Sequence, residues 1–214
     1  MSFSLLKESF NQKSLLRTVQ NREFYNQKLE GNVIDLGARN GDASYYKFFD
    51  TENAKITFVD KYSDSQNVLN IDLEEDLPID NAEYDYALSI NLFEHIFNVQ
   101  NLIEETYRIL KDGGELIGAT PFSKEYHADP NDYYRFTQDF YQKIFQIVGF
   151  KEIKIVPVGV GLFHSIANDL TRIIRLKIIR YLIWVLFINL DRLLNRFYKN
   201  NHNFYCSLVF YCKK

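Results

Sequence analysis

A short strand that ends in a glycine-rich turn constrains the fold of this chain more than any other feature. Residues 33–36 form an apolar run, interrupted by Asp35, between Gly31 and Gly37. Such a run is typical of a buried parallel strand. Gly37 and Gly41 let the backbone approach a ligand closely, and we expect the N-terminus of a helix to follow. A plain connection between a strand and a helix is the alternative interpretation.

Strand and helix patterns alternate after this turn. Further strands are predicted at residues 55–60, 68–72, 84–90 and 115–120, with helices at 43–49 and 92–110. This alternation predicts an α/β fold with a doubly wound parallel sheet.

The pattern changes after the fifth strand. A helix is predicted at residues 138–148, and two last strands at 151–156 and 204–211. The link between these strands is too long for a simple loop. We therefore predict a helical lead-in at residues 1–30 and one domain at 31–214, with a helical insertion of basic and apolar residues at about 161–201.

Composition excludes several classes of protein. The 214 residues carry a formal net charge of −3, which gives no general attraction to nucleic acid. Cys206 and Cys212 are predicted to be reduced, and the first residues lack a signal-peptide pattern, so we expect a cytoplasmic protein. The spacing of the histidines fits no metal-ligand motif, so no metal site is predicted; they are His95, His127, His164 and His202.

Acidic residues end the second and third strands. Asp60 follows a strand that comes after the glycine turn, where a carboxylate commonly binds the ribose hydroxyls of an adenosine. Asp72 ends the next strand and is placed to face the adenine. The alternatives are a helix-capping role for Asp60 and a solvated acidic loop around Asp72.

The order of these segments resembles the class I S-adenosylmethionine-dependent methyltransferases. The resemblance covers residues 30–156 and 203–213 and includes Asp-Leu-Gly-Ala-Arg-Asn-Gly at 35–41, Leu-Phe-Glu-His-Ile at 92–96 and Leu-Lys-Asp-Gly-Gly-Glu-Leu-Ile at 110–117. It implies a Rossmann-like sheet of seven strands with the last strand antiparallel. It also implies S-adenosyl-L-methionine as the cofactor.

The resemblance assigns cofactor-binding roles to individual residues. The methionine part of the cofactor would be bordered by Asp35, Gly37 and Gly41, the ribose held by Asp60, the adenine edge met by Asp72 and Leu73, and the sulfonium placed over Asn91. Arg39 departs from the pattern, because it stands where the family has its middle glycine. Either its side chain points outward or cofactor binding is weakened.

Residues 127–137 carry a second resemblance. His-Ala-Asp-Pro-Asn-Asp-Tyr-Tyr-Arg-Phe-Thr is similar to a segment of methyltransferases associated with bacterial surface-polysaccharide biosynthesis. His127 could take a proton from an attacking hydroxyl, and Arg135 could clamp a carboxylate or phosphate. His95 is predicted to lie near the substrate. The alternatives are a structural histidine at 95 and a structural loop in which Arg135 pairs with Asp132.

The insertion combines basic residues with apolar positions at helical spacing over residues 166–198. Its longest apolar run, at 181–188, is too short to span a bilayer. This pattern is typical of a helix lying on a membrane surface, here the inner membrane. An ordinary amphipathic helix, packed on the domain or on a second copy of the chain, is the alternative.

These observations predict an enzyme that methylates a small molecule, which we expect to be a saccharide or a lipid-linked glycan precursor. The alternative is a catalytically inactive protein of the same fold that binds or scaffolds through its amphipathic insertion. A nicotinamide-dependent dehydrogenase is disfavoured, because a third glycine in register is missing from the turn.

Overall fold

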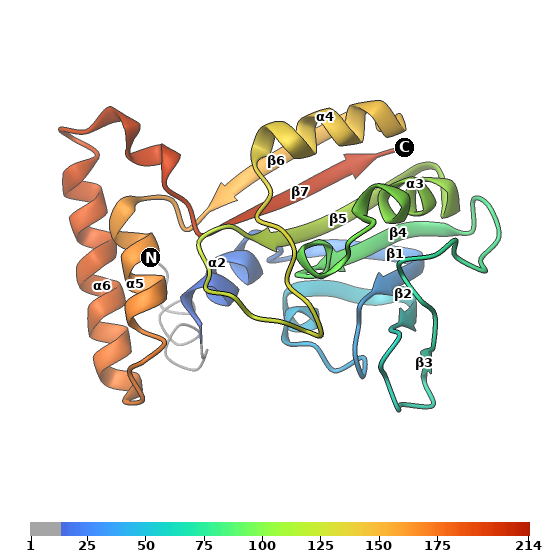
Figure 1. The fold of residues 1–214 in the computed structure, drawn as a ribbon, viewed down its shortest axis with the longest axis horizontal. Coiled ribbons are helices and arrows are strands. Elements are labelled where there is room, and N and C mark those ends of the chain that lie inside the picture. Colours follow the sequence, from blue (N-terminus) through green and yellow to red (C-terminus); the bar gives the residue numbers. More distant parts are fainter. Residues whose placement is uncertain (1–13) are drawn as a thin grey trace.

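The computed structural model describes residues 14–214; the beginning of the predicted lead-in, residues 1–13, lies outside the described residues. A seven-stranded sheet with the order β3-β2-β1-β4-β5-β7-β6 forms the centre of the molecule (Figure 1). The strand β7 runs antiparallel to both of its neighbours, β5 and β6, and all other strand pairs in this sheet are parallel. The Rossmann-like sheet predicted from the sequence is therefore confirmed. Its strands are β1 (Gln27–Leu36), β2 (Phe49–Val59), β3 (Val68–Leu69), β4 (Tyr84–Ile90), β5 (Leu110–Pro121), β6 (Glu152–Val158) and β7 (Ser207–Lys213).

Strand order reverses between β1 and β4, which are neighbours in the sheet. The chain continues outward from β1 to β2 and β3 on one side, and from β4 to β5 on the other. In open α/β sheets, the crevice at the carboxyl ends of strands beside such a reversal is where ligands bind. The fold therefore predicts a ligand-binding site at the segments that follow β1, β2, β4 and β5.

Helices cover the two faces of the sheet unequally. One face packs against α3 (Val99–Ile109) and α4 (Gln138–Val148), and the other against α2 (Leu15–Glu23) and the 3-10 helix η1 (Ser44–Phe48). The helix α4 begins at Thr137, whose side chain accepts a hydrogen bond from the Phe140 amide, and ends at Gly149 with φ of 114°. Both ends of this helix match the sequence prediction.

Several predicted boundaries are wrong. The strand expected at 68–72 is only β3, which ends at Leu69. The helix expected at 43–49 is only the short η1, because β2 already begins at Phe49 and leaves no length for a full crossover helix. The helix expected at 92–110 begins at Val99, after a 3-10 turn, η2 (Phe93–His95). The strand β1 begins at Gln27, so the end of the predicted helical lead-in belongs to the sheet.

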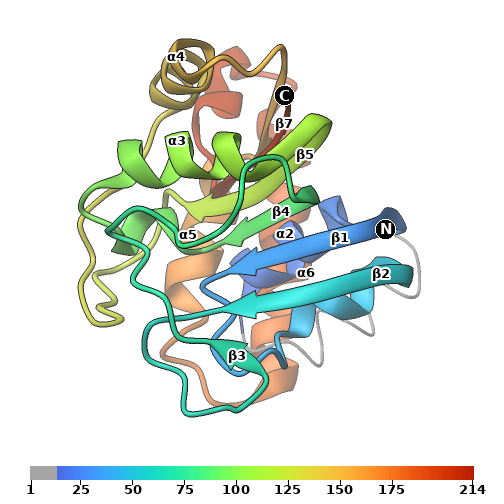
Figure 2. The same cartoon turned by 90° about the vertical axis from the view of Figure 1, so that its right-hand side faces the viewer.

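The insertion forms a helical hairpin at the end of the sheet where β6 finishes and β7 starts (Figures 1 and 2). It contains α5 (Leu162–Leu170), α6 (Lys177–Leu194) and the 3-10 helix η3 (Lys199–Asn203). Trp184 of α6 is buried against Leu15 and Ala167, and its indole Nε1 donates to Thr171 Oγ1 at 2.9 Å. Within residues 14–214, no helix is both long and apolar enough to cross a bilayer.

Candidate functional site

A pocket lies at the carboxyl ends of β1, β2 and β4, and we call it the strand-end pocket. Four of the predicted cofactor residues line it, namely Gly37, Asp60, Asp72 and Leu73. His95 of η2 and Asp129 of the loop after β5 also line it.

The carboxylate of Asp60 accepts hydrogen bonds from the backbone of two turns, the one after β1 and the one after β2. Its Oδ2 accepts a hydrogen bond from the Arg39 amide at 2.9 Å, and its Oδ1 accepts one from the Tyr62 amide at 2.8 Å. An ionised carboxylate has about four acceptor positions, so Asp60 can accept further hydrogen bonds from a ligand's hydroxyl groups. This capacity fits the ribose of S-adenosylmethionine.

Asp72 supplies a second carboxylate to the same pocket. It pairs with Lys61, and its Oδ1 accepts a hydrogen bond from the Glu74 amide at 3.1 Å. The hydrogen bond from Lys61 lowers the pKa of Asp72, so the group is an acceptor at neutral pH. Together with Asp60, it gives the pocket acceptors for both the hydroxyls and the exocyclic amine of an adenosine.

The turn after β1 favours glycine at position 37. Gly37 has φ of +74°, and a Cβ there would lie 2.8 Å from Leu92 Cδ1. Because that conformation strains other residues and the Leu92 side chain would have to shift, a side chain is disfavoured. Gly41 also has positive φ but lies against the ring of Phe58, outside the pocket lining.

Arg39 occupies the middle of the turn without filling the pocket. Its backbone has φ of +56°, the conformation that a glycine would adopt there. The side chain is 73% exposed, and its guanidinium lies 3.1 Å from Asp129 Oδ2 in the loop after β5. The side chain therefore points outward, as one of the two sequence interpretations predicted, and connects the turn to the loop.

Asp35 lies below the pocket and does not line it. Its carboxyl is fully buried and accepts hydrogen bonds from the hydroxyls of Tyr45, at 2.6 Å, and of Tyr46. Burial raises the pKa of Asp35 to about 7, although both tyrosine hydrogen bonds act to lower it. The two tyrosines belong to η1, so this contact joins the short crossover to the end of β1.

A second pocket adjoins the first, and we call it the histidine pocket. Asn91, His95 and His127 line it, and it shares His95 and Asp129 with the strand-end pocket. Asn91, at the end of β4, has φ of +55° and exchanges side-chain hydrogen bonds of 2.8 and 3.2 Å with Gln20. A molecule in the histidine pocket would thus lie next to one in the strand-end pocket.

Cationic side chains also line the histidine pocket: Arg17 from α2, Lys124 from the loop after β5, and Arg172 from the segment between α5 and α6. Burial and the nearby Arg172 lower the pKa of Lys124 to about 8. Arg172 pairs with Glu125, while its buried Nη2 has no hydrogen-bond partner among the described residues. These charges favour an anionic group in the pocket.

The loop after β5 brings His127 against His95, with ring centroids 4.9 Å apart. The amide of Tyr133 donates to the carbonyl of Glu94 at 2.8 Å, which fastens the loop to η2. Glu94 was not among the predicted site residues, although its buried carboxyl lies against both rings. Its position beside His95 in the 92–96 segment was the signal that could have identified it.

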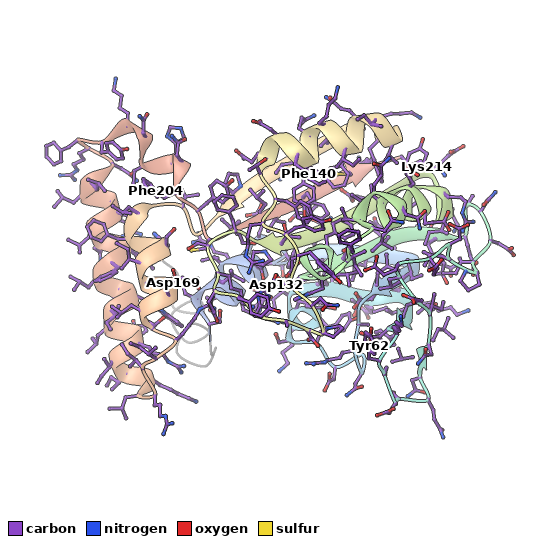
Figure 3. All side chains as sticks on the ribbon, in the orientation of Figure 1. Tyr62, Asp132, Phe140, Asp169, Phe204 and Lys214 are labelled. Carbon is purple, nitrogen blue, oxygen red and sulfur yellow. The ribbon has the colours of Figure 1, made fainter. Side chains whose placement is uncertain are left out.

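Arg135 lies apart from the two pockets. Its guanidinium pairs with Asp132 at 2.5 and 2.7 Å and donates to the carbonyls of Lys124, Glu125 and Tyr134. This geometry is the structural alternative considered from the sequence. Figure 3 shows Asp132 in the loop between β5 and α4, so the pair shapes the segment that carries His127. The clamp role of Arg135 stays a prediction.

The cationic residues of the histidine pocket were missed by sequence reasoning. Arg17, Lys124 and Arg172 belong to three separate segments and to no common motif. Only the folded hairpin and loop bring them to one place, so spacing along the chain carries no signal for them.

Comparisons of sequence give one family. Residues 8–153 match the model of the family described as a methyltransferase domain. No curated protein matches the chain in sequence.

Solved structures of methyltransferases share the fold. A SAM-dependent methyltransferase from Archaeoglobus fulgidus is 18% identical with a TM-score of 0.58, and the alignment covers 94% of this chain and 92% of that one. A SAM-dependent methyltransferase from Aquifex aeolicus is 15% identical with a TM-score of 0.55, over the full length of both chains. Phosphoethanolamine N-methyltransferase 2 from Haemonchus contortus, in complex with S-adenosyl-L-methionine, is 16% identical with a TM-score of 0.56.

The last of these alignments covers 91% of this chain but only 52% of the Haemonchus enzyme, so the chain spans about half of that relative's length. At such identities these structures establish the fold alone. The family model, in contrast, covers more than half of the chain. The strand order, the acids at the strand ends and this match agree, and the chain belongs to the methyltransferase domain family.

Proposed function

We propose that the protein transfers a methyl group from S-adenosyl-L-methionine to a small acceptor. The strand-end pocket would hold the cofactor, with Asp60 on the ribose hydroxyls, Asp72 and Leu73 at the adenine, and Gly37 beside the methionine part. The cofactor supplies a methyl group on a sulfonium, which is already a good leaving group. The protein's task is therefore chiefly to align the acceptor with the methyl group.

The histidine pocket is the binding place that we assign to the acceptor. The single observation that carries this assignment is the wall of His95 and Asp129 that the two pockets share. We assign His95 and His127 to the activation of a hydroxyl acceptor, because both line the pocket and an imidazole can take the proton of a hydroxyl group. Arg135 would position His127 through Asp132, with the anion clamp as its second proposed role.

The charges of the histidine pocket support an acceptor with a carboxylate or a phosphate. Lys124, Arg172 and Arg17 can each donate hydrogen bonds to such a group. A saccharide or a lipid-linked glycan precursor of surface polysaccharide, methylated on a hydroxyl or a carboxylate, satisfies this requirement. The resemblance of residues 127–137 to enzymes of that kind points to the same class.

Mass spectrometry of reaction mixtures tests this proposal. The purified protein and S-adenosylmethionine would be incubated with uronic-acid, phosphosugar and neutral sugar acceptors, and the product of each would be searched for one added methyl group. We expect the wild type to methylate an acidic acceptor and Lys124→Ala to methylate it at a lower rate. A neutral sugar should be a poor substrate for both proteins. Equal rates for acidic and neutral acceptors would contradict the assignment of the charges.

We also propose that α6 contacts an anionic membrane surface. Ile178, Leu182 and Leu186 are spaced four residues apart on one helix face and are 60, 59 and 55% exposed. Basic residues surround this apolar face along the chain: Arg175, Lys177, Arg180, Arg192, Arg196 and Lys199. A helix with this combination binds at the interface of anionic lipid, where a lipid-linked acceptor would be found.

Flotation with vesicles distinguishes membrane contact from dimer formation. We expect the protein to float with phosphatidylglycerol vesicles but not with phosphatidylcholine vesicles, and Leu182→Glu with Leu186→Glu to abolish flotation. Leu69→Glu, at a 50% exposed apolar residue of β3, is the matched control. A protein that stays soluble with both lipids and elutes as a dimer would assign the face to a second copy instead.

A further inference from the structure

The carboxylate of Glu94 is buried without a hydrogen-bond partner. Its side chain is fully inaccessible to solvent, and neither Oε1 nor Oε2 has a partner among the described residues. A buried carboxylate in this situation is strongly destabilising unless a positive charge compensates it. Lys124 and Arg135 influence it only from a distance, because no hydrogen bond joins either one to it.

Two histidines direct their Nε2 atoms at this carboxylate. Glu94 Oε1 lies 3.7 Å from His95 Nε2 and 3.8 Å from His127 Nε2. The three potential ligand atoms all lie within 4.8 Å of one another, and His127 Nε2 is also buried without a partner. A tetrahedral zinc ion with ligands at about 2.0–2.2 Å separates them by roughly 3.3–3.6 Å. The two distances from the carboxylate to the imidazoles are therefore slightly wider than the ligand separations of a loaded site.

The other ring nitrogens are held as they are in metal-binding histidines. His95 Nδ1 lies 2.5 Å from the carbonyl oxygen of Asn131. His127 Nδ1 lies 3.2 Å from Asp132 Oδ2 and 3.2 Å from the carbonyl oxygen of Glu125. A proton on Nδ1 that is donated to such an acceptor leaves the lone pair of Nε2 free for a cation.

The rigid surroundings keep these groups together. The ring of Phe93 stacks on Phe210 of β7 with centroids 5.7 Å apart, which fixes η2 on the sheet. Arg135 Nη2 lies 3.4 Å from His127 Nδ1 and donates to Asp132 Oδ2 at 2.7 Å, so it holds the acceptor beside that ring. Two backbone segments thus converge on one point from opposite sides.

We propose that Glu94, His95 and His127 bind one divalent transition-metal cation, for which Zn²⁺ is the best match to two imidazoles and a carboxylate. The charge of the ion would compensate the buried carboxylate. A site with three protein ligands keeps a coordination position open. Since His95 lines both pockets, the open position would lie where the two pockets meet, and an acceptor oxygen would bind there. This role of the ion in binding the acceptor rests on the proposed methyl transfer, whereas the metal site itself does not.

The sequence prediction of no metal site considered only spacing between histidines. His95 and His127 are far apart along the chain, and the loop after β5 brings them together beside Glu94. No spacing rule covers ligands assembled in this way.

The test is calorimetric titration of the chelator-treated full-length protein with Zn²⁺, repeated with Co²⁺ while its visible absorption is recorded. We expect one equivalent to bind, and Glu94→Gln and His127→Asn each to weaken binding by at least about tenfold. His202→Asn is the matched control, because that ring is exposed and its hydrogen-bond partner among residues 14–214 is the Lys199 carbonyl. Circular dichroism establishes that each variant is folded.

Absence of stoichiometric binding to the folded protein, or binding that is equal in Glu94→Gln, His127→Asn and wild type, would overturn the proposal. Titration of the same metal-free samples with S-adenosylmethionine separates this result from the proposed function. We expect that affinity to be retained in Glu94→Gln, because Asp60 and Asp72 are unchanged. A wild type that binds S-adenosylmethionine but not Zn²⁺ would therefore refute the metal site alone.

Discussion

The buried carboxyl of Asp35 makes the stability of the protein depend on pH. Its pKa is about 7 in the folded state against an ordinary value of 3.8. At a pH between these two values, the Asp35 carboxyl has released its proton in the unfolded chain but still holds it in the folded protein. Stability from this group is therefore fully present below pH 3.8 and falls as the pH rises to about 7. The two values differ by about 3, equivalent to about 4 kcal/mol at about 1.4 kcal/mol for each unit.

Asp35→Asn removes this ionisation but keeps an oxygen that accepts from Tyr45 and Tyr46. We expect the variant and the wild type to have similar free energies of unfolding at pH 4. At pH 7.5 the variant should be more stable than the wild type by about 4 kcal/mol, which is a large fraction of the total free energy of unfolding of a typical protein. Urea titrations followed by circular dichroism at several pH values measure the free energies of unfolding of the variant and the wild type. The contributions of other titrating groups are the same in both proteins and cancel in the difference.

A matched variant tests the cause of the shift. Tyr46 donates to the carboxylate and so lowers the pKa of Asp35; Tyr46→Phe should move the midpoint of the pH dependence above 7. A stability difference between Asp35→Asn and wild type that stays constant from pH 4 to 7.5 would refute the reasoning.

Two further predictions concern the turn and the hairpin. Arg39→Gly should retain cofactor binding and change the free energy of unfolding by less than about 1 kcal/mol, because the ion pair of Arg39 with Asp129 is exposed. A large loss of affinity for S-adenosylmethionine in calorimetry would contradict this prediction. Trp184→Ala should destabilise the hairpin by about 3–5 kcal/mol and expose α5 and α6 to hydrogen exchange, because the indole fills the core between them. Retained protection in these helices would contradict that account.

The sheet was predictable because its strands carry buried apolar runs that end in recognisable turns. Asp60 and Asp72 were identifiable for the same reason, since Asp60 directly follows β2, Asp72 comes three residues after β3, and both line the strand-end pocket. Asp35 shows the limit of this method: it ends its strand in the same manner, yet Tyr45 and Tyr46 enclose it. Nothing in the strand pattern reports what covers a residue.

The remaining errors come from contacts between distant segments. The predicted crossover helix was lost to an extended β2, whose early residues pair with Gln27 and Lys28 of β1. The histidine pocket draws residues from α2, η2, the loop after β5 and the hairpin. Because its parts meet only in the folded protein, Lys124 and Glu94 could not be recognised from spacing.

Binding of S-adenosylmethionine to the strand-end pocket tests the central claim most directly. Calorimetric titration of the wild type with S-adenosylmethionine and S-adenosylhomocysteine should give micromolar affinity. Asp60→Ala should weaken both by at least about tenfold, because it removes charged acceptors for the ribose hydroxyls. Asp64→Ala, an exposed acid in the same loop, should bind as the wild type does. A folded wild type that binds neither compound, or an Asp60→Ala variant of unchanged affinity, would contradict the account.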